Sequence, residues 1–285
     1  MKKALSLMTA AALVLSLAAC GSTASSAASS EAASSETASS DAASSEAASS
    51  EAASETETAE LSTVEPGKLI MSTNAAFPPY EMTTDSGEFE GIDIETAQAI
   101  ADKLGLELQI DDMDFDAALL SVQQGKADIV MAGVTVTDER KAVMDFSDSY
   151  ATGIQSIIVP EGSDITSPDD LAGKKIGTQR GTTGYIYCSD DFGDDAVVAY
   201  DDGLTAVQAL NNGQVDAVVI DNAPAKEFVA ANPGLVILDT SYAEEDYAIG
   251  LAKGSALEDA VNAALEELKA DGTLQSIVDK YITAE

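Results

Sequence analysis

Histidine is absent from the 285 residues of this chain, and cysteine occurs only at Cys20 and Cys188. Without histidine, neither a histidine-based nucleophilic triad nor a histidine-ligated metal site can form. A serine–lysine pair or carboxylates could still support catalysis, but no spacing in the chain argues for them. We therefore expect no metal and no cofactor. Cys20 lies at the end of an apolar N-terminal run, so we also expect no internal disulfide, with Cys188 as a small, partly buried side chain.

Basic residues are scarce. The chain has 14 lysines and arginines against 50 aspartates and glutamates, a formal net charge of −36. Beyond residue 64 the count is 12 basic to 42 acidic residues. A surface of this charge repels phosphate groups, which excludes nucleic acid as a partner and makes an anionic membrane surface a poor one.

The first 20 residues have the layout of an export signal. Lys2 and Lys3 precede an apolar run over residues 4–19. This run is too short to remain in a membrane as a spanning helix, which needs about 20 apolar residues. Leu17, Ala18, Ala19 and Cys20 resemble the lipobox of bacterial lipoproteins, in which the cysteine takes a lipid. We predict a signal peptide over residues 1–19 and a lipid on Cys20 that anchors the protein to the outer face of the cytoplasmic membrane. An ordinary signal peptide with an incidental cysteine is the alternative.

Residues 20–64 are predicted to be a disordered tether. They are almost entirely Ser, Ala, Thr and Glu, with an acidic residue at every fifth position from Glu31 to Glu51. Such a segment has too little apolar bulk to offset the entropy of ordering. As a flexible coil it spans on the order of 35 Å, which holds a folded domain clear of the lipid headgroups.

The rest of the chain alternates short β-rich runs with helical patterns, which is typical of an α/β fold with parallel strands. We predict strands over residues 68–71, 106–110, 129–132 and 175–178. We predict helices over residues 94–104 and 116–124, a third helix that Thr137 caps and that contains Arg140, and two more that begin at Ser167 and Thr182.

One stretch of sequence occurs twice. Residues 120–133 align without a gap on residues 208–221, so that Gly125 meets Gly213 and Asp128 meets Asp216. Each copy reads as a helix, a glycine break and a buried strand, which predicts two similar lobes. In open parallel sheets ligands lie beyond the carboxyl ends of the strands. The loops at these ends contain both arginines of the chain, Arg140 and Arg180.

Six segments in this region resemble a known family in their order. They are TNAAFPPYE, GIDIETAQAIADKLG, DFDAALLSVQQGKADIVMAGVTVTDER, DFSDSY, IGTQRGTTG and DAVVIDNAPA. The chain thus resembles the solute-binding proteins of polar amino-acid ABC importers, amino-acid-binding protein family 3. The resemblance implies a two-lobed periplasmic-binding-protein-like fold with a hinge between two α/β lobes. Lobe one would comprise residues 65–156 plus 252–285 and lobe two residues 157–251, with chain crossings near 155–159 and 248–251.

The same resemblance implies a ligand site. Arg140 would bind the ligand's α-carboxylate through its planar fork, and Asp221 the α-ammonium group. The other implied contacts are Gly133 and Thr135 at the amine, Thr182 and Thr183 at the carboxylate, Phe77 and Phe115 beside the carbon chain, and Asn74 and Gln179 at the side chain. From the residues alone, Arg140 could be merely solvated, Phe77 plain core, and Asp221 only a helix cap.

Two positions bear on the ligand. Asn74 is neutral where relatives that bind cationic side chains carry an acid, which argues modestly against lysine or arginine. Arg180 could point outward or favour an acidic side chain. The sequence leaves the amino acid open.

The resemblance implies a function in transport. A monomeric, lipid-anchored protein would bind an amino acid on lobe one, close lobe two over it and deliver it to an ABC transporter permease. A lipid-anchored amino-acid sensor is one alternative. An enzyme resembling cyclohexadienyl dehydratase is another, but it needs a general acid or base in the cleft, where only Asp221 is available by this assignment. We therefore do not expect an enzyme.

Overall fold

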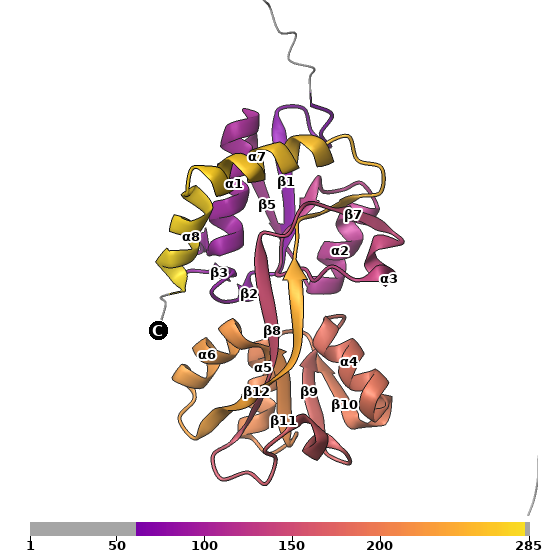
Figure 1. The fold of residues 1–285 in the computed structure, drawn as a ribbon, viewed down its shortest axis with the longest axis vertical. Helices are drawn as coiled ribbons and strands as arrows, with labels where there is room; N and C mark the ends of the chain where they lie inside the picture. Colours follow the sequence, from indigo (N-terminus) through magenta and orange to yellow (C-terminus); the bar gives the residue numbers. More distant parts are fainter. Residues whose placement is uncertain (1–60, 283–285) are drawn as a thin grey trace, which may run out of the picture. The chain divides into compact units, whose positions relative to one another are not determined.

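The computed structural model describes residues 61–282. The predicted signal peptide, Cys20 and the tether up to residue 60 lie outside the described residues. Two five-stranded sheets dominate the described part, with strand orders β5-β1-β6-β13-β7 and β10-β9-β11-β8-β12 (Figure 1). Within residues 61–282, no helix combines the length and the hydrophobicity that a membrane crossing requires.

The first sheet is buried on both faces. Its strands are β1 (Lys68–Thr73), β5 (Glu107–Asp112), β6 (Ile129–Val130), β7 (Met144–Phe146) and β13 (Gly250–Ala252). Helices α1 (Ile92–Leu104), α7 (Glu258–Ala270) and α8 (Thr273–Tyr281) pack together on one side, and α2 (Phe115–Gln123) and α3 (Asp138–Lys141) on the other (Figure 1). Along β1, Leu69 and Met71 join the core under α1, whereas Ile70 joins the core under α2. Burial on both faces explains why residues 69–71 of β1 are apolar in succession instead of alternating with polar residues.

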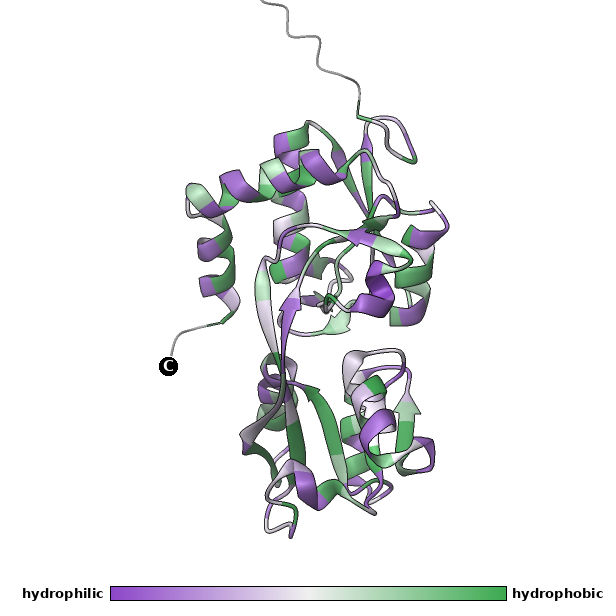
Figure 2. Ribbon diagram, turned by 45° about the vertical axis from the view of Figure 1, so that its right-hand side comes forward, coloured by the Kyte–Doolittle hydropathy of each residue, from purple (hydrophilic) through white to green (hydrophobic). Residues whose placement is uncertain are grey.

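The second sheet repeats this construction. Its strands are β8 (Ala151–Pro160), β9 (Ile176–Gln179), β10 (Val197–Tyr200), β11 (Ala217–Asp221) and β12 (Leu235–Tyr247). Its helices are α4 (Thr183–Phe192), α5 (Gly203–Asn211) and α6 (Asn222–Ala231). The strands of this sheet are coloured mostly as hydrophobic in Figure 2, as expected for a sheet between two helical layers. Cys188 of α4 is completely buried, more than the sequence predicted, in the core that lies between α4 and the sheet.

Smaller elements complete the described chain. A three-stranded sheet is formed by β2 (Ala76–Phe77), β3 (Glu81–Thr83) and β4 (Phe89–Glu90), and single 3₁₀ turns lie at η1 (Pro168–Leu171) and η2 (Asp194–Ala196). The predicted helix at Ser167 is therefore only such a turn, because Gly173 follows it closely with a positive φ of 77°. The predicted strand over residues 129–132 is shorter than expected, since only its first two residues pair in a ladder.

Local sequence signals set several of the helix ends. Gly105 ends α1 in the left-handed conformation, with a φ of 69°. The Thr137 side chain accepts a hydrogen bond from the Arg140 amide at 3.2 Å, and Thr182 accepts one from the Tyr185 amide at 3.3 Å. Thr137 is thus the predicted N-cap, and Thr182, where a helix was predicted to begin, is the N-cap of α4.

The sequence repeat is a structural repeat. Helices α2 and α5 have nine residues each, and both are followed by a left-handed glycine, Gly125 at φ 66° and Gly213 at φ 67°. Asp128 Oδ2 then accepts the Ile70 amide at 2.8 Å, and Asp216 Oδ2 accepts the Lys175 amide at 2.7 Å. In each lobe the aspartate ties the strand after the helix to the start of the neighbouring strand.

Two long strands join the lobes. β8 and β12 pair antiparallel from Ala151↔Tyr247 to Pro160↔Leu235, and they run between the two halves of Figure 1. The predicted second crossing at residues 248–251 is too late in the chain. Gly250 and Leu251 already pair with β6 and β7 in the first sheet, so the crossing lies within β12 and the lobe boundary belongs near Tyr247 rather than residue 251.

The repeated aspartates should differ in their effect on stability. Asp128 is buried and also accepts the Val64 amide at 2.7 Å, whereas Asp216 is exposed and holds a single amide. We expect Asp128→Ala to lower the free energy of unfolding in urea by about 2 kcal/mol, because it leaves two amides without their acceptor. The matched variant Asp216→Ala should lose less than about 1 kcal/mol. Equal losses in the two variants would contradict this account.

Candidate functional site

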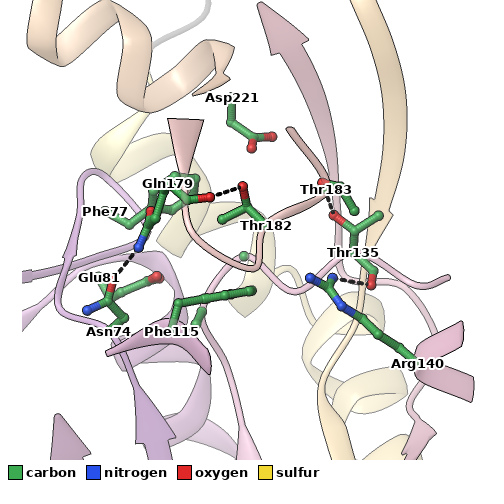
Figure 3. A pocket seen from close by; sticks show the side chains of 12 residues that line it. Asn74, Phe77, Glu81, Phe115, Thr135, Arg140, Gln179, Thr182, Thr183 and Asp221 are labelled. Carbon is green, nitrogen blue, oxygen red and sulfur yellow. Dashed lines mark hydrogen bonds between the residues drawn. The ribbon is translucent and has the colours of Figure 1, made fainter. Parts of the chain in front are cut away.

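A cavity with about 20 Å³ of free volume lies where the carboxyl ends of strands from both sheets come together (Figure 3). This volume is enough for about one water molecule. The lining residues are Asn74, Phe77, Glu81, Phe115, Ala132, Gly133, Thr135, Arg140, Gln179, Thr182, Thr183 and Asp221. All ten residues that the resemblance implied are among them, and Glu81 and Ala132 are additions. The structure therefore brings the whole predicted set together around one space.

Arg140 lies at one side of the cavity, on α3. Only 8% of it is exposed, so it is not a merely solvated arginine. Nη1 donates to the Thr135 carbonyl at 2.7 Å and Nη2 to the Gly181 carbonyl at 3.2 Å, while the guanidinium lies 5.4 Å from the centroid of the Phe115 ring. Burial lowers the pKa of the guanidinium below its usual value, but an arginine remains charged in a protein. The result is a fixed, desolvated positive charge at the cavity.

Asp221 is the last residue of β11 and brings a carboxylate to the same cavity. The Tyr247 hydroxyl donates to Oδ1, and Gln155 Nε2 donates to Oδ2 at 2.6 Å. Burial, with a smaller contribution from the nearby Glu245, raises the pKa of Asp221 to about 7 against the effect of these two hydrogen bonds. Asp221 stands at the N-cap position of α6, but its side chain makes no capping hydrogen bond to that helix.

Three threonines lie between the two charged groups. The Thr135 and Thr183 hydroxyls are 3.4 Å apart, and both residues are almost completely buried. Thr182 donates to the Gln179 carbonyl at 2.8 Å while it caps α4, so its hydroxyl is already occupied by its own turn. Thr183 is the first residue of α4, where backbone N–H groups lack helical partners and favour an anion.

Two amide side chains close another side of the cavity. Gln179 Nε2, at the end of β9, donates to Asn74 Oδ1 at 2.8 Å, and Asn74 Nδ2 donates to the Met113 carbonyl at 3.0 Å. Since Asn74 follows β1 and Gln179 ends β9, this bond links the two lobes directly. The side-chain amides of Asn74 and Gln179 carry no charge, so this side of the cavity is polar but neutral.

Sequence reasoning missed the acidic groups behind the cavity. Glu81 has no exposed surface, and burial together with nearby Asp93 raises its pKa well above the usual range. Burial raises the pKa of Asp93 to about 6, while Asp93 accepts hydrogen bonds from the Gly133 amide at 3.0 Å and the Tyr150 hydroxyl at 2.7 Å. The sequence had suggested that Asp221 is the only acid at the cleft. Glu81 lines the same cavity, so this prediction was wrong. Glu81 stands inside the motif TNAAFPPYE, which was the available signal.

Arg180 does not join the cavity. Its side chain is 56% exposed and lies 3.6 Å from Asp201, beside a crevice that Phe115 and Asp116 also line. Of the two interpretations from sequence, the outward orientation is the one observed. Within residues 61–282, no three acidic or cysteine side chains are grouped to hold a metal ion.

Comparison with known proteins now identifies the family. The model of the bacterial extracellular solute-binding proteins, family 3, matches residues 69–284. The L-cystine-binding protein TcyJ of Escherichia coli (strain K12) is 34% identical over 226 residues, which cover 78% of this chain and 85% of TcyJ. The crystal structures of ArtJ, the arginine-, lysine-, histidine-binding protein from Geobacillus stearothermophilus, include a chain that is 34% identical. It has a TM-score of 0.73, and the match covers 76% of this chain and 96% of ArtJ.

An ancestral arginine-binding protein bound to glutamine is 42% identical with a TM-score of 0.73, and the match covers 77% of this chain and all of that one. These relatives have the two-lobed amino-acid-binding fold, which confirms the predicted fold class. The family match extends over nearly all of the described residues. The chain belongs to family 3 of the bacterial extracellular solute-binding proteins.

Proposed function

We propose that the cavity binds an extracytoplasmic amino acid as a zwitterion and that the protein delivers it to an ABC permease. Membership of the family supports amino-acid capture in transport. One observation carries the assignment of this cavity: a buried guanidinium, Arg140, and a buried carboxyl group, Asp221, border the same small space. A site for an amino-acid zwitterion needs a cation to bind the carboxylate and, a short distance away, an anion to bind the ammonium group.

Arg140 and Thr183 form the proposed carboxylate subsite. The Arg140 fork is held in place by two backbone carbonyls, so little conformational entropy is lost when a carboxylate binds it. The N-terminus of α4 at Thr183 contributes backbone N–H groups from the other lobe. Because Thr182 already uses its hydroxyl within its own turn, we assign it mainly to shaping this loop.

Asp221, Thr135 and Gly133 form the proposed amine subsite. Asp221 supplies the charge, Thr135 a hydroxyl acceptor and Gly133 a backbone carbonyl, which together match the three donors of an ammonium group. Gly133 has a φ of 54°, and an added Cβ would lie 2.9 Å from the Phe77 ring. Glycine is therefore required at this position both by the backbone conformation and by the close packing.

The ligand's side chain would lie between Phe77 and Phe115 and reach the Asn74–Gln179 pair. Relatives are named for binding cystine, arginine and histidine, and one ancestral protein was solved with glutamine. The neutral amide pair suits an uncharged polar end, whereas the nearby Glu81 suits a cationic one. A panel of these four amino acids thus covers the chemistry that the cavity presents.

We further propose that the protein acts as a monomer anchored by a lipid on Cys20, on the outer face of the cytoplasmic membrane. The lipobox-like residues 17–20 and the tether composition support this. A role in binding rather than catalysis is supported by the relatives, which are named as binding proteins.

The two arginines of the chain provide a test of the site. L-arginine, L-histidine, L-glutamine and L-cystine are titrated into the protein by calorimetry, and we expect at least one to bind. Arg140→Ala should weaken that binding by at least about 100-fold, because a charge-assisted, desolvated pair loses its cation. Arg180→Ala removes an equal charge from the exposed surface and should leave affinity within about twofold.

Similar affinities for the Arg140→Ala variant and the unaltered protein would show that the carboxylate subsite lies elsewhere. No heat with any of the four amino acids, confirmed by an unchanged melting temperature, would contradict the proposed ligand class.

The approach of the lobes can be tested at Gly181. A Cβ at this residue would lie 1.6 Å from Asp116 Oδ1, the end of an exposed side chain on the first lobe. We expect Gly181→Ala to weaken binding by about three- to tenfold, because either the Asp116 side chain or the second lobe must shift. Gly213→Ala is the matched control, since Gly213 has a similar positive φ but open space around it. The double variant Asp116→Ala/Gly181→Ala should recover affinity, and failure to recover would point to backbone strain instead.

Binding should also depend on pH through Asp221. With a pKa of about 7, this carboxyl group is partly protonated near neutrality, and an ammonium ligand requires it ionised. Ligand binding therefore lowers its pKa and releases a proton, and affinity should fall about tenfold between pH 8 and pH 6. Calorimetry in buffers of different ionisation enthalpy measures that proton. Asp221→Asn should bind more weakly and with a much shallower pH profile, because Asp93 is then left as an acid at the site with a pKa in this range. An equally steep profile in that variant would exclude Asp221 as the titrating group.

A further inference from the structure

Glu245 is a buried acid close to the cavity that does not line it. It lies on β12, one of the two strands that join the lobes, and is only 5% exposed. Its Oε2 accepts two hydrogen bonds, from Thr135 Oγ1 at 3.0 Å and from Gln155 Nε2 at 3.0 Å. Burying a carboxylate costs free energy unless it is paired and hydrogen-bonded.

The backbone of Thr135 is fixed on several sides. Its carbonyl accepts Arg140 Nη1 at 2.7 Å, and the residue forms an isolated bridge with Tyr247 at the end of β12. The flanking amides of Val136 and Ala248 complete this bridge, through bonds of 3.0 Å and 3.1 Å. The backbone of Thr135 is therefore fixed, and its side-chain contacts determine the rotamer and the direction of the hydroxyl hydrogen.

A hydroxyl carries one hydrogen and two lone pairs. Glu245 Oε2 accepts the hydrogen of the Thr135 hydroxyl, so that hydrogen points away from the cavity and the hydroxyl keeps lone pairs for the cavity side. An ammonium group has three donors and no acceptor. A hydroxyl turned the other way would present a hydrogen to that cation and repel it.

Gln155 links this arrangement to the second charged group. The same Nε2 that donates to Glu245 donates to Asp221 Oδ2 at 2.6 Å. The two acids are thus held by one amide, with Thr135 bound to Glu245 from the first lobe.

We propose that Glu245 is a positioning residue for the amine subsite, whose carboxylate takes the hydroxyl hydrogen of Thr135 and so turns a lone pair toward the ligand's ammonium group. This inference rests on the proposed function. Glu245 acts through Thr135 and does not contact the ligand. Its effect on ligand affinity comes from the acceptor oxygen that it provides and not from its charge.

A double-mutant cycle tests this role. The probe is whichever of L-arginine, L-histidine, L-glutamine and L-cystine binds the unaltered protein most tightly in calorimetry. Thr135→Val removes the hydroxyl and should weaken binding about 30-fold, while Glu245→Leu removes the acceptor and should weaken it about tenfold. Because both act on one hydrogen bond, the double variant should lose about 30-fold rather than the product of the two losses.

Glu245→Gln separates the acceptor from the charge. Both hydrogen bonds go to a single oxygen, so a glutamine carbonyl at that place can accept both, and affinity should stay within about threefold. A loss as large as that of Glu245→Leu would show that charge is what matters and would overturn the proposal. Losses that multiply in the double variant would also overturn it.

Folding of each variant is checked by circular dichroism and melting temperature. If Glu245→Leu does not fold, Glu245→Met, with an unbranched side chain, takes its place in the cycle. If the unaltered protein binds none of the four probes, the proposed function has failed. If it binds one of them and the cycle is additive, the role of Glu245 alone has failed.

Discussion

Parallel pairing of strands in two separate sheets is the constraint on which the cavity depends. β1 pairs with β6 and β9 with β11, and each pair ends beside the same space. The ends deliver Asn74, Gly133, Gln179 and Asp221 with no need for a long structured loop. The repeated aspartates Asp128 and Asp216 hold the neighbouring strands in this register, so the duplication in the sequence accounts for a site shared by two lobes.

The balance of charge at the cavity follows from burial. Asp221 and Glu81 lie where water cannot solvate an anion, and the pKa of each is raised in consequence. Arg140, in contrast, keeps its charge despite equal burial. Such a site has a permanent cation and acids that can gain or lose protons, so it can carry little net charge when empty. When an ammonium group binds, the acids can ionise and pair with it. The same desolvation strengthens both contacts once the ligand fills the space.

The sequence predicted these groups unequally, for physical reasons. The cap at Thr137 and the helix start at Thr182 depend on residues three positions away, so local chemistry was sufficient. The grouping of Arg140 with Asp221 came from ordered motifs and a family resemblance, since 81 positions separate them in the sequence. Glu81 stands within a family motif, but the sequence does not identify it as a buried acid, because its burial depends on packing that involves distant elements. The crossing near Tyr247 was misplaced because strand pairing, which no local pattern encodes, decides where one sheet ends.

Strand β12 unites these arguments. It crosses between the lobes and also carries Glu245 and Tyr247, which contact Thr135 in the first lobe and Asp221 in the second. A change in the angle between the lobes must therefore alter the groups around the amine. In turn, an ammonium ion that draws Thr135 and Asp221 together favours the lobe arrangement in which β12 satisfies both. A ligand shifts a conformational equilibrium only to the extent that it binds one state more tightly than the other. The contacts of Thr135 and Asp221 with β12 connect the two lobes, so they are the contacts through which the ligand can distinguish one lobe arrangement from another.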